Sequence, residues 1–130
     1  MERQNISTGT PWEATAGYSR AVKVGPFIYV AGTTATDSSG KISSLDPYEQ
    51  THHILEKIGA ALESVGASMS DVVRSRVYLT NMDDYPAVAK AHGEVFSEIR
   101  PANTLVEVSR LAIPEMLVEI DVDAVVSDDQ

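Results

Sequence analysis

Three carboxylates near the C-terminus are the first side chains in the sequence whose spacing suggests chemistry. Glu119, Asp121 and Asp123 alternate with apolar residues in the segment LVEIDVDAVV. Successive side chains on a β-strand point to opposite faces, so this spacing places all three carboxylates on one face. Three like charges in a row repel, and the sequence predicts that water or cations cover this face. How it is covered decides which of the three could act as a base.

The three histidines offer weaker candidates. His52 and His53 are adjacent and point about 100° apart on a helix, so they cannot chelate one metal ion as an i, i+4 pair would. His92 lies within an apolar helical stripe, which favours a hydrogen-bonded core or edge histidine over a catalytic base. The chain has no cysteine, which excludes disulfides, thiolate metal sites and thiol nucleophiles. We expect neither a metal nor a cofactor.

Charge and composition narrow the class of partner. The 130 residues carry a formal net charge of −9, and the 10 Lys and Arg do not cluster, so phosphate backbones are repelled. No stretch approaches the roughly 18 apolar residues of a membrane span, and MERQNISTGT lacks the apolar run of a secretory signal. We therefore expect a single-domain cytoplasmic protein without nucleic-acid or membrane partners.

The elements that position these residues begin with a hairpin. Residues 18–36 predict two strands joined by a turn at Gly25-Pro26. The second strand, 27–31, is apolar on both faces, whereas a half-exposed strand would alternate. Both faces of this strand must be covered, and in so short a chain the cover can come from another subunit.

Two helices are predicted further along the chain. Asp46 is placed to cap the first helix, with Pro47 at its first position, and the helix ends near Val65 before a glycine. The second begins near Asp83 or Asp84 and ends before the Arg100-Pro101 pair. Both carry an apolar stripe at helical spacing, so each is expected to pack one face on a sheet.

Three further strands are predicted at 72–80, 103–108 and 117–126. In the first of them Val73, Ser75, Val77 and Leu79 are expected on one face, and Arg74, Arg76 and Tyr78 on the other. The order β-β-α-β-α-β-β predicts an α+β fold, with a mixed sheet and both helices on one face. The other face would pair arginines with the acidic row, and its aromatic residues suit an oligomer interface.

The block RPANTLVEVSRL followed by LVEIDVDAVV closely resembles the Rid/YjgF family, also called the L-PSP endoribonuclease or reactive-intermediate deaminase family. The segment GYSRAVKVGPFIYVAGTTA resembles that family's N-terminal hairpin, and the similarity extends over residues 14–126. The resemblance implies a chorismate-mutase-like fold, a homotrimer and a small-molecule cleft at each subunit interface.

The resemblance also implies roles for individual residues. Deaminases of the family hydrolyse enamine or imine intermediates such as 2-aminoacrylate, and a glutamate that positions water matches Glu119. A tyrosine that shapes the cleft matches Tyr18, and a small hydroxyl residue is replaced by Ala31. The arginine that binds the substrate carboxylate is replaced by Asn103. A neutral amide cannot neutralise a carboxylate as a guanidinium fork does.

This replacement leaves several functions open. The first is binding or conversion of a small metabolite other than an amino-acid-derived imine, with Glu119 as base, water holder or ion-pair partner of an arginine across the trimer. The second is residual imine deaminase activity that uses Arg100 or another cation. The third is ribonuclease activity or inhibition of translation, which the acidic charge disfavours. The fourth is a structural or interaction role without chemistry.

The two ends of the chain carry the remaining expectations. Residues 1–11 are polar and broken by Gly and Pro, which predicts a loose arm, and residues 127–130 predict a frayed tail. Trp12 either anchors the arm or closes the pocket; we predict that it helps to close the pocket. The single domain is expected to span residues 1–130.

Overall fold

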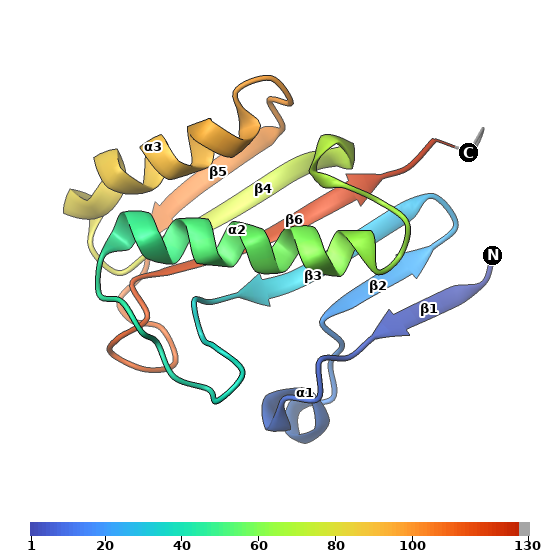
Figure 1. Cartoon of the computed structure of the whole chain (residues 1–130), viewed down its shortest axis with the longest axis horizontal. Helices are drawn as coiled ribbons and strands as arrows, with labels where there is room; N and C mark the ends of the chain where they lie inside the picture. The colour runs from blue at the N-terminus through green and yellow to red at the C-terminus, as the bar shows by residue number, and fades with distance from the viewer. Residues whose placement is uncertain (128–130) are drawn as a thin grey trace.

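The structure is a computed structural model that describes residues 1–127 (Figure 1). One six-stranded sheet runs through the molecule, and the two longer helices lie on the same side of it. The elements in chain order are β1 (Arg3–Ile6), α1 (Pro11–Ala16), β2 (Ala21–Val24), β3 (Phe27–Thr33), α2 (Pro47–Glu63), β4 (Val72–Leu79), α3 (Tyr85–Phe96), β5 (Ala102–Glu107) and β6 (Val118–Val125). The predicted α+β class and the placement of two helices on one face are confirmed.

The sheet has the strand order β1-β2-β3-β6-β4-β5. The pair β4–β5 is parallel and is joined through α3, while the other neighbouring strands are antiparallel. The C-terminal strand β6 therefore lies between β3 and β4, at the centre of the sheet. This placement makes its acidic residues neighbours of the arginines on β4.

Local signals explain the two long helices. The Asp46 carboxylate accepts a hydrogen bond from the Glu49 amide at 3.0 Å, and Pro47 occupies the first turn of α2, as predicted. Gly66 has a φ of +83°, a conformation suited to the chain reversal after the helix. In α3 the buried residues are Val88, Ala91 and Phe96. The apolar stripe predicted for this helix began at Tyr85, which is exposed, so that prediction was partly wrong.

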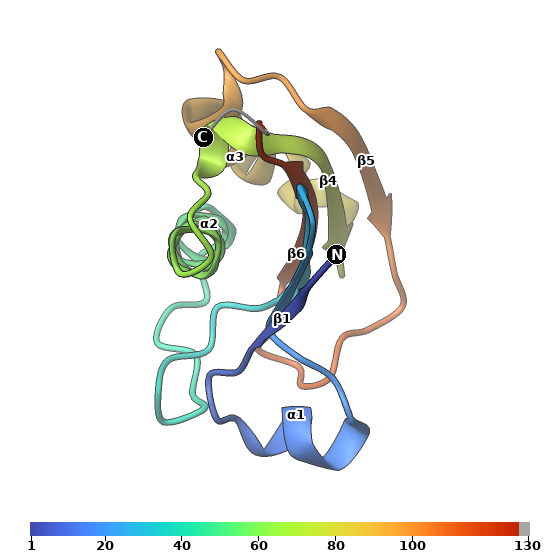
Figure 2. The ribbon, with the colours of Figure 1, turned by 90° about the vertical axis from the view of Figure 1, so that its right-hand side faces the viewer.

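Figure 2 shows the sheet edge-on, with α2 and α3 covering one face and none of the described helices over the other. The core lies between the helices and the covered face. Its largest fully buried apolar side chains are Ile28, Ile54, Ile58, Leu62, Leu79, Ile120, Val77, Val88, Val118 and Val122. The alternation predicted for the last strand is confirmed, since Ile120 is buried on the helix side. In β3 Ile28 is buried whereas Phe27 and Tyr29 are exposed, so within one chain only one face of this strand is covered. Among the residues described, no helix has both the length and the apolar character to cross a membrane.

The N-terminal prediction was wrong. Residues 1–11 were expected to form a loose arm, but Arg3–Ile6 pairs with β2 as an additional strand and Pro11–Ala16 forms a short helix. Backbone pairing needs no apolar side chains, so the polar segment RQNI carried no periodic signal for a strand. The element order therefore has a strand and a helix more than predicted. The tail predicted over 127–130 lies outside the described residues, apart from Ser127.

Val73 is a second correction. The alternation placed it on the covered face with Ser75, but Val73 is 49% exposed while Val72 and Ser75 are buried. The pairing of β4 with β6 shifts between Val72 and Arg74. A bulge adds one residue to a strand and reverses the face of the side chains beyond it. Alternation alone cannot locate such a shift.

Candidate functional site

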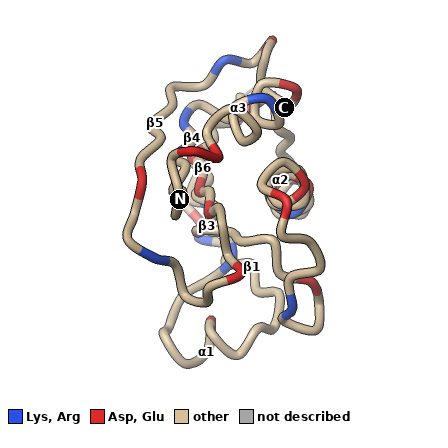
Figure 3. Tube along the Cα trace, turned by 90° about the vertical axis from the view of Figure 1, so that its left-hand side faces the viewer, with Lys and Arg blue, Asp and Glu red and all other residues tan. Residues whose placement is uncertain are grey.

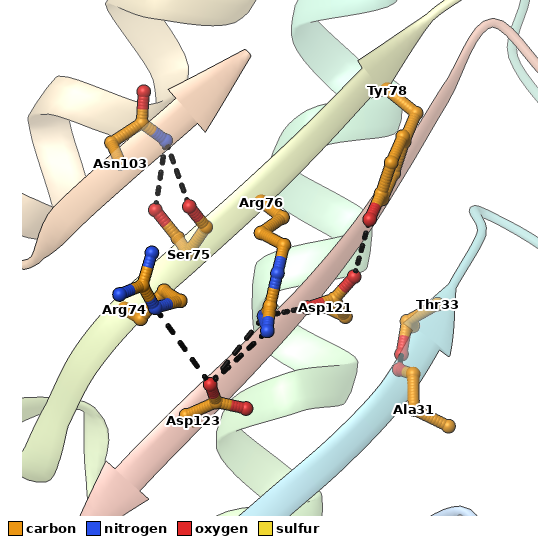
Figure 4. Close-up of polar contacts among 9 residues, drawn as sticks. All are labelled: Ala31, Thr33, Arg74, Ser75, Arg76, Tyr78, Asn103, Asp121 and Asp123. Carbon is orange, nitrogen blue, oxygen red and sulfur yellow. Dashed lines mark hydrogen bonds and ion pairs between the residues drawn. The ribbon is translucent and has the colours of Figure 1, made fainter. Parts of the chain in front are cut away.

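The acidic row on β6 lies on the open face of the sheet and is largely neutralised from β4. Arg76 Nη1 donates to Asp121 at 3.0 Å, and Arg76 Nη2 lies 3.4 Å from Asp123 (Figure 4). Arg74 Nε lies 4.0 Å from the same carboxylate of Asp123. Tyr78 donates its hydroxyl proton to Asp121 at 3.0 Å. The predicted cross-strand Arg–carboxylate pairs are confirmed for Asp121 and Asp123.

Glu119, the third carboxylate of the row, lies in a different environment. It is partly buried and packs against the backbone of Gly32, where a Cβ would overlap the carboxylate. Desolvation raises the pKa of Glu119; the nearby positive charge of Arg20 partly opposes this shift, and the negative charge of Asp121 adds to it. A carboxylate with a raised pKa accepts a proton more readily than an ordinary one and can also hold a water molecule.

Arg20 is held beside Glu119 by the end of β3. Its Nη1 donates to the Gly32 carbonyl and to the Thr33 hydroxyl, each at 3.0 Å, while Thr33 donates to the Ala31 carbonyl at 2.8 Å. The Nε atom is buried without a hydrogen-bond partner among the described residues. Ala31 stands where the resemblance implies a small hydroxyl residue, and its backbone N–H donates to the Arg20 carbonyl at 3.0 Å. Ala31 and Glu119 are thus brought together around Arg20.

Tyr18 and Trp12 lie on the segment that leads into β2. Tyr18 is 40% exposed, and the Arg20 guanidinium lies 5.8 Å from the centre of its ring. Tyr18 therefore belongs to the same neighbourhood as Glu119. Trp12, on the short helix α1, is 54% exposed. More than half of its surface is uncovered within this chain, and its predicted contribution to a cleft stays a prediction.

Asn103 lies at the other edge of the sheet, on β5. Its Nδ2 atom donates to the Ser75 carbonyl at 3.3 Å and to the Ser75 hydroxyl at 2.9 Å (Figure 4). The Ser75 hydroxyl oxygen lies 2.9 Å from Nε2 of His92 on α3. Burial lowers the pKa of His92, which favours the neutral ring. His92 is therefore a hydrogen-bonded core-edge residue, as predicted.

Arg100 does not reach Asn103 within this chain. It has a positive φ of 53°, and its Nε donates to the Ser97 carbonyl at 3.1 Å. The guanidinium therefore caps a carbonyl at the end of α3.

Asn103 and Glu119 lie on opposite faces of the sheet. Asn103 is paired with Ser75, and Glu119 is paired with Tyr78, three residues further along β4. Ser75 is fully buried on the helix side, whereas Tyr78 contacts the acidic row on the open face. A hollow of about 450 Å³ beside α2 is lined by other residues: Ala35, Ser43, Ser44, Glu49, Gln50 and His53. A single chain thus does not join the two predicted site residues in one pocket.

Sequence reasoning missed four residues that organise these sites. Arg20 and Gly32 shape the surroundings of Glu119, Ser75 orients Asn103, and Glu13 fastens the N-terminal segment. Arg20 could have been noticed, because an arginine beside an apolar strand needs a partner. The Gly32 contact and the Ser75 bond depend on the register between distant strands, for which the sequence carries no local signal.

The sheet with helices on one face and an open, charged and aromatic face on the other defines a small single-sheet α+β protein. A family model described as Endoribonuclease L-PSP matches residues 8–126. The chain belongs to this family, the Rid/YjgF family of the sequence resemblance.

Individual relatives agree with this assignment. A RutC family protein from Pyrococcus abyssi is 40% identical over 122 residues, which cover 93% of this chain and 95% of the relative. A protein named 3-aminoacrylate deaminase RutC, from Acinetobacter baylyi, is 36% identical over 88% of this chain and 90% of its own length. Among solved structures, a YjgF family member from Mycobacterium tuberculosis superposes with a TM-score of 0.89 at 42% identity, covering 96% of this chain and all of the other.

Proposed function

We propose that this chain forms a homotrimer whose inter-subunit clefts bind a small metabolite that is not 2-aminoacrylate. The observation that carries the proposal is the separation of Asn103 and Glu119 onto opposite faces of one sheet. Both positions match ligand-contacting positions of the family, so a site that uses both needs a second protomer. Arg20, Ala31 and Tyr18 would accompany Glu119 from one subunit, and Asn103 would come from its neighbour.

The open face of the sheet supports the oligomer. Phe27 and Tyr29 are 43% and 50% exposed there, beside the paired charges of Arg76, Asp121 and Asp123. Large apolar side chains gathered on an uncovered sheet face are typical of a surface that another protein covers. A three-fold arrangement of copies would bury these aromatic rings and shield the ion pairs from water.

The chemistry at Asn103 favours a ligand without a carboxylate at that position. Loss of a charged bidentate contact in a cleft costs several kcal/mol, or roughly a thousandfold in affinity. Arg100 offers no replacement within this chain, because its guanidinium is bonded to the end of α3. Glu119 with its raised pKa remains available as a base or water holder.

Imine or enamine deamination is the second candidate. It is favoured by the 36% identity to the protein named 3-aminoacrylate deaminase and by the presence of Glu119. Nuclease activity receives less support, because Figure 3 shows the Lys and Arg positions dispersed along the described trace instead of forming a basic stripe. We further propose that the protein is cytoplasmic and has neither a membrane nor a nucleic acid as partner.

Two measurements test the proposal. Light scattering after size exclusion should give the mass of three chains, and a thermal-shift screen of metabolites should find a ligand whose effect is lost in Glu119→Ala. A monomer in solution would contradict the proposal of inter-subunit clefts. Hydrolysis of 2-aminoacrylate, generated by a coupled dehydratase, should be far slower than in the Asn103→Arg variant. Parent activity equal to that of an arginine-bearing relative would support the deaminase instead.

A further inference from the structure

The orientation of the Asn103 side chain follows from its partners. Its Nδ2 lies 3.3 Å from the Ser75 carbonyl oxygen and 2.9 Å from the Ser75 hydroxyl. A backbone carbonyl can only accept a hydrogen bond, so the nitrogen of the amide must face Ser75 and the oxygen must face away. Figure 4 shows the Asn103 oxygen on the side of the amide opposite to Ser75. Asn103 is exposed, so Oδ1 is the atom that it offers to a ligand.

Ser75 and His92 hold the amide in this orientation. The Ser75 oxygen accepts from Asn103, and its own proton is then free to be donated to His92 Nε2 at 2.9 Å. Nε2 can accept that proton only in a neutral ring that carries its hydrogen on Nδ1. Burial of His92 favours the neutral ring, and Ser75 has no exposed surface. The three residues form one directed chain from β5 through β4 to α3.

We infer that Asn103 accepts a hydrogen bond from an N–H group of the ligand, such as that of a carboxamide or ureido group. The inference rests on the proposed cleft and specifies the ligand class for that cleft. A carboxylate oxygen facing Oδ1 would place two acceptors together without a proton between them, and both would lose their bonds to water. Ser75 and His92 are positioning residues, because they act on the ligand only through Asn103.

Matched pairs of small probes test this polarity. We expect propionamide and pyruvamide to bind the parent protein at least about tenfold more tightly than propionate and pyruvate, as measured by NMR titration of the oligomer. Asn103→Arg should reverse the preference. Tighter binding of the acids to the parent would overturn the inference and leave the proposed cleft intact. If no probe binds, the proposed cleft fails, and the inference about its ligand fails with it.

Variants of the positioning residues separate orientation from folding. Ser75→Ala removes the shorter of the two bonds that hold the Asn103 amide and leaves only the 3.3 Å bond to the backbone carbonyl, so the amide turns more easily and the amide-to-acid affinity ratio should fall by about fivefold. Ser75→Thr retains the hydroxyl and should retain the ratio. An unchanged ratio in Ser75→Ala would overturn the positioning role.

A measurement without ligand follows the same amide. The side-chain ¹⁵N resonance that disappears in Asn103→Asp should have slowly exchanging protons in the parent and faster exchange in Ser75→Ala. Fast exchange in the parent would overturn the inferred orientation, whatever the probes do.

Discussion

Glu13 and Glu119 are both removed from bulk water, but their surroundings differ. Glu13 is 5% exposed and accepts hydrogen bonds from Ser7 at 2.8 Å, from Thr8 at 3.2 and 2.6 Å and from Thr10 at 3.0 Å. Burial alone would raise its pKa, but these bonds outweigh burial and hold the pKa below its usual value. At Glu119 desolvation dominates and the pKa is raised.

The difference distinguishes a carboxylate that stabilises the fold from one that is available for chemistry. Glu13 joins the end of β1 to α1 and has its oxygens occupied by the protein's own donors. Glu119 rests against the Gly32 backbone, with its charge balanced only in part by Arg20. Retaining an under-solvated carboxylate costs free energy, which is typical of functional sites. Substitutions at or beside the two glutamates test this contrast.

The largest expected effect is the loss of stability when Glu13 is replaced. Glu13→Ala removes the acceptor of four hydrogen bonds and leaves the Ser7, Thr8 and Thr10 hydroxyls without it, so the free energy of unfolding should fall by about 2–4 kcal/mol. Denaturant unfolding measures this change. Glu2→Ala, at an exposed position, is the control and should stay within about 0.5 kcal/mol. A Glu13→Ala protein as stable as the control would mean that this glutamate does not fasten the N-terminal segment.

The next effect concerns Gly32. Gly32→Ala places a Cβ where the Glu119 carboxylate lies, so the side chain must move, at a cost of about 1–2 kcal/mol. Binding of the screened ligand should weaken as it does in Glu119→Ala. Gly93→Ala is the matched control, because a Cβ there meets no atom within 4 Å and lies within α3. It should leave binding unchanged and stabilise the helix slightly. If Gly32→Ala bound the ligand with full affinity, Glu119 would not contribute to the proposed cleft.

The contrast also marks what a sequence can predict. Period-two alternation and helix signals act over a few residues, so the covered face, Asp46 and the acidic row were predicted correctly. The strand β1 was missed because it pairs through its backbone, and Val73 was misplaced by a bulge. The hydrogen bonds of Asn103 were beyond prediction, because they require β5 to lie parallel to β4 in one particular register. Similarly, Glu13 lies among polar residues whose convergence only the folded loop reveals.

Glu119→Gln should have a smaller effect on stability, and in the opposite direction to Glu13→Ala. A neutral amide of the same shape avoids the cost of desolvating a charge and removes the repulsion from Asp121. The free energy of unfolding at neutral pH should stay the same or rise by less than about 1 kcal/mol. Ligand binding should fall at the same time. A loss of stability similar to that of Glu13→Ala would indicate a structural ion pair instead of a functional group.

The two carboxylates should finally be distinguishable by pH, where the expected effect is smallest. The folded-state pKa of Glu119 is raised above its ordinary value of 4.5, so its contribution to stability is complete below that pH and is lost as pH rises through the folded-state pKa. The folded-state pKa of Glu13 is lowered, so its contribution is complete above 4.5 and is lost as pH falls. The parent protein should therefore lose stability relative to Glu119→Gln as pH rises, and gain it relative to Glu13→Gln. Unfolding free energies between about pH 2.5 and 7 measure both differences, with Gly93→Ala as a control that changes no titratable group. If the two stability differences, parent minus Glu119→Gln and parent minus Glu13→Gln, changed with pH in the same direction, the surroundings of the two glutamates would not differ as their contacts indicate.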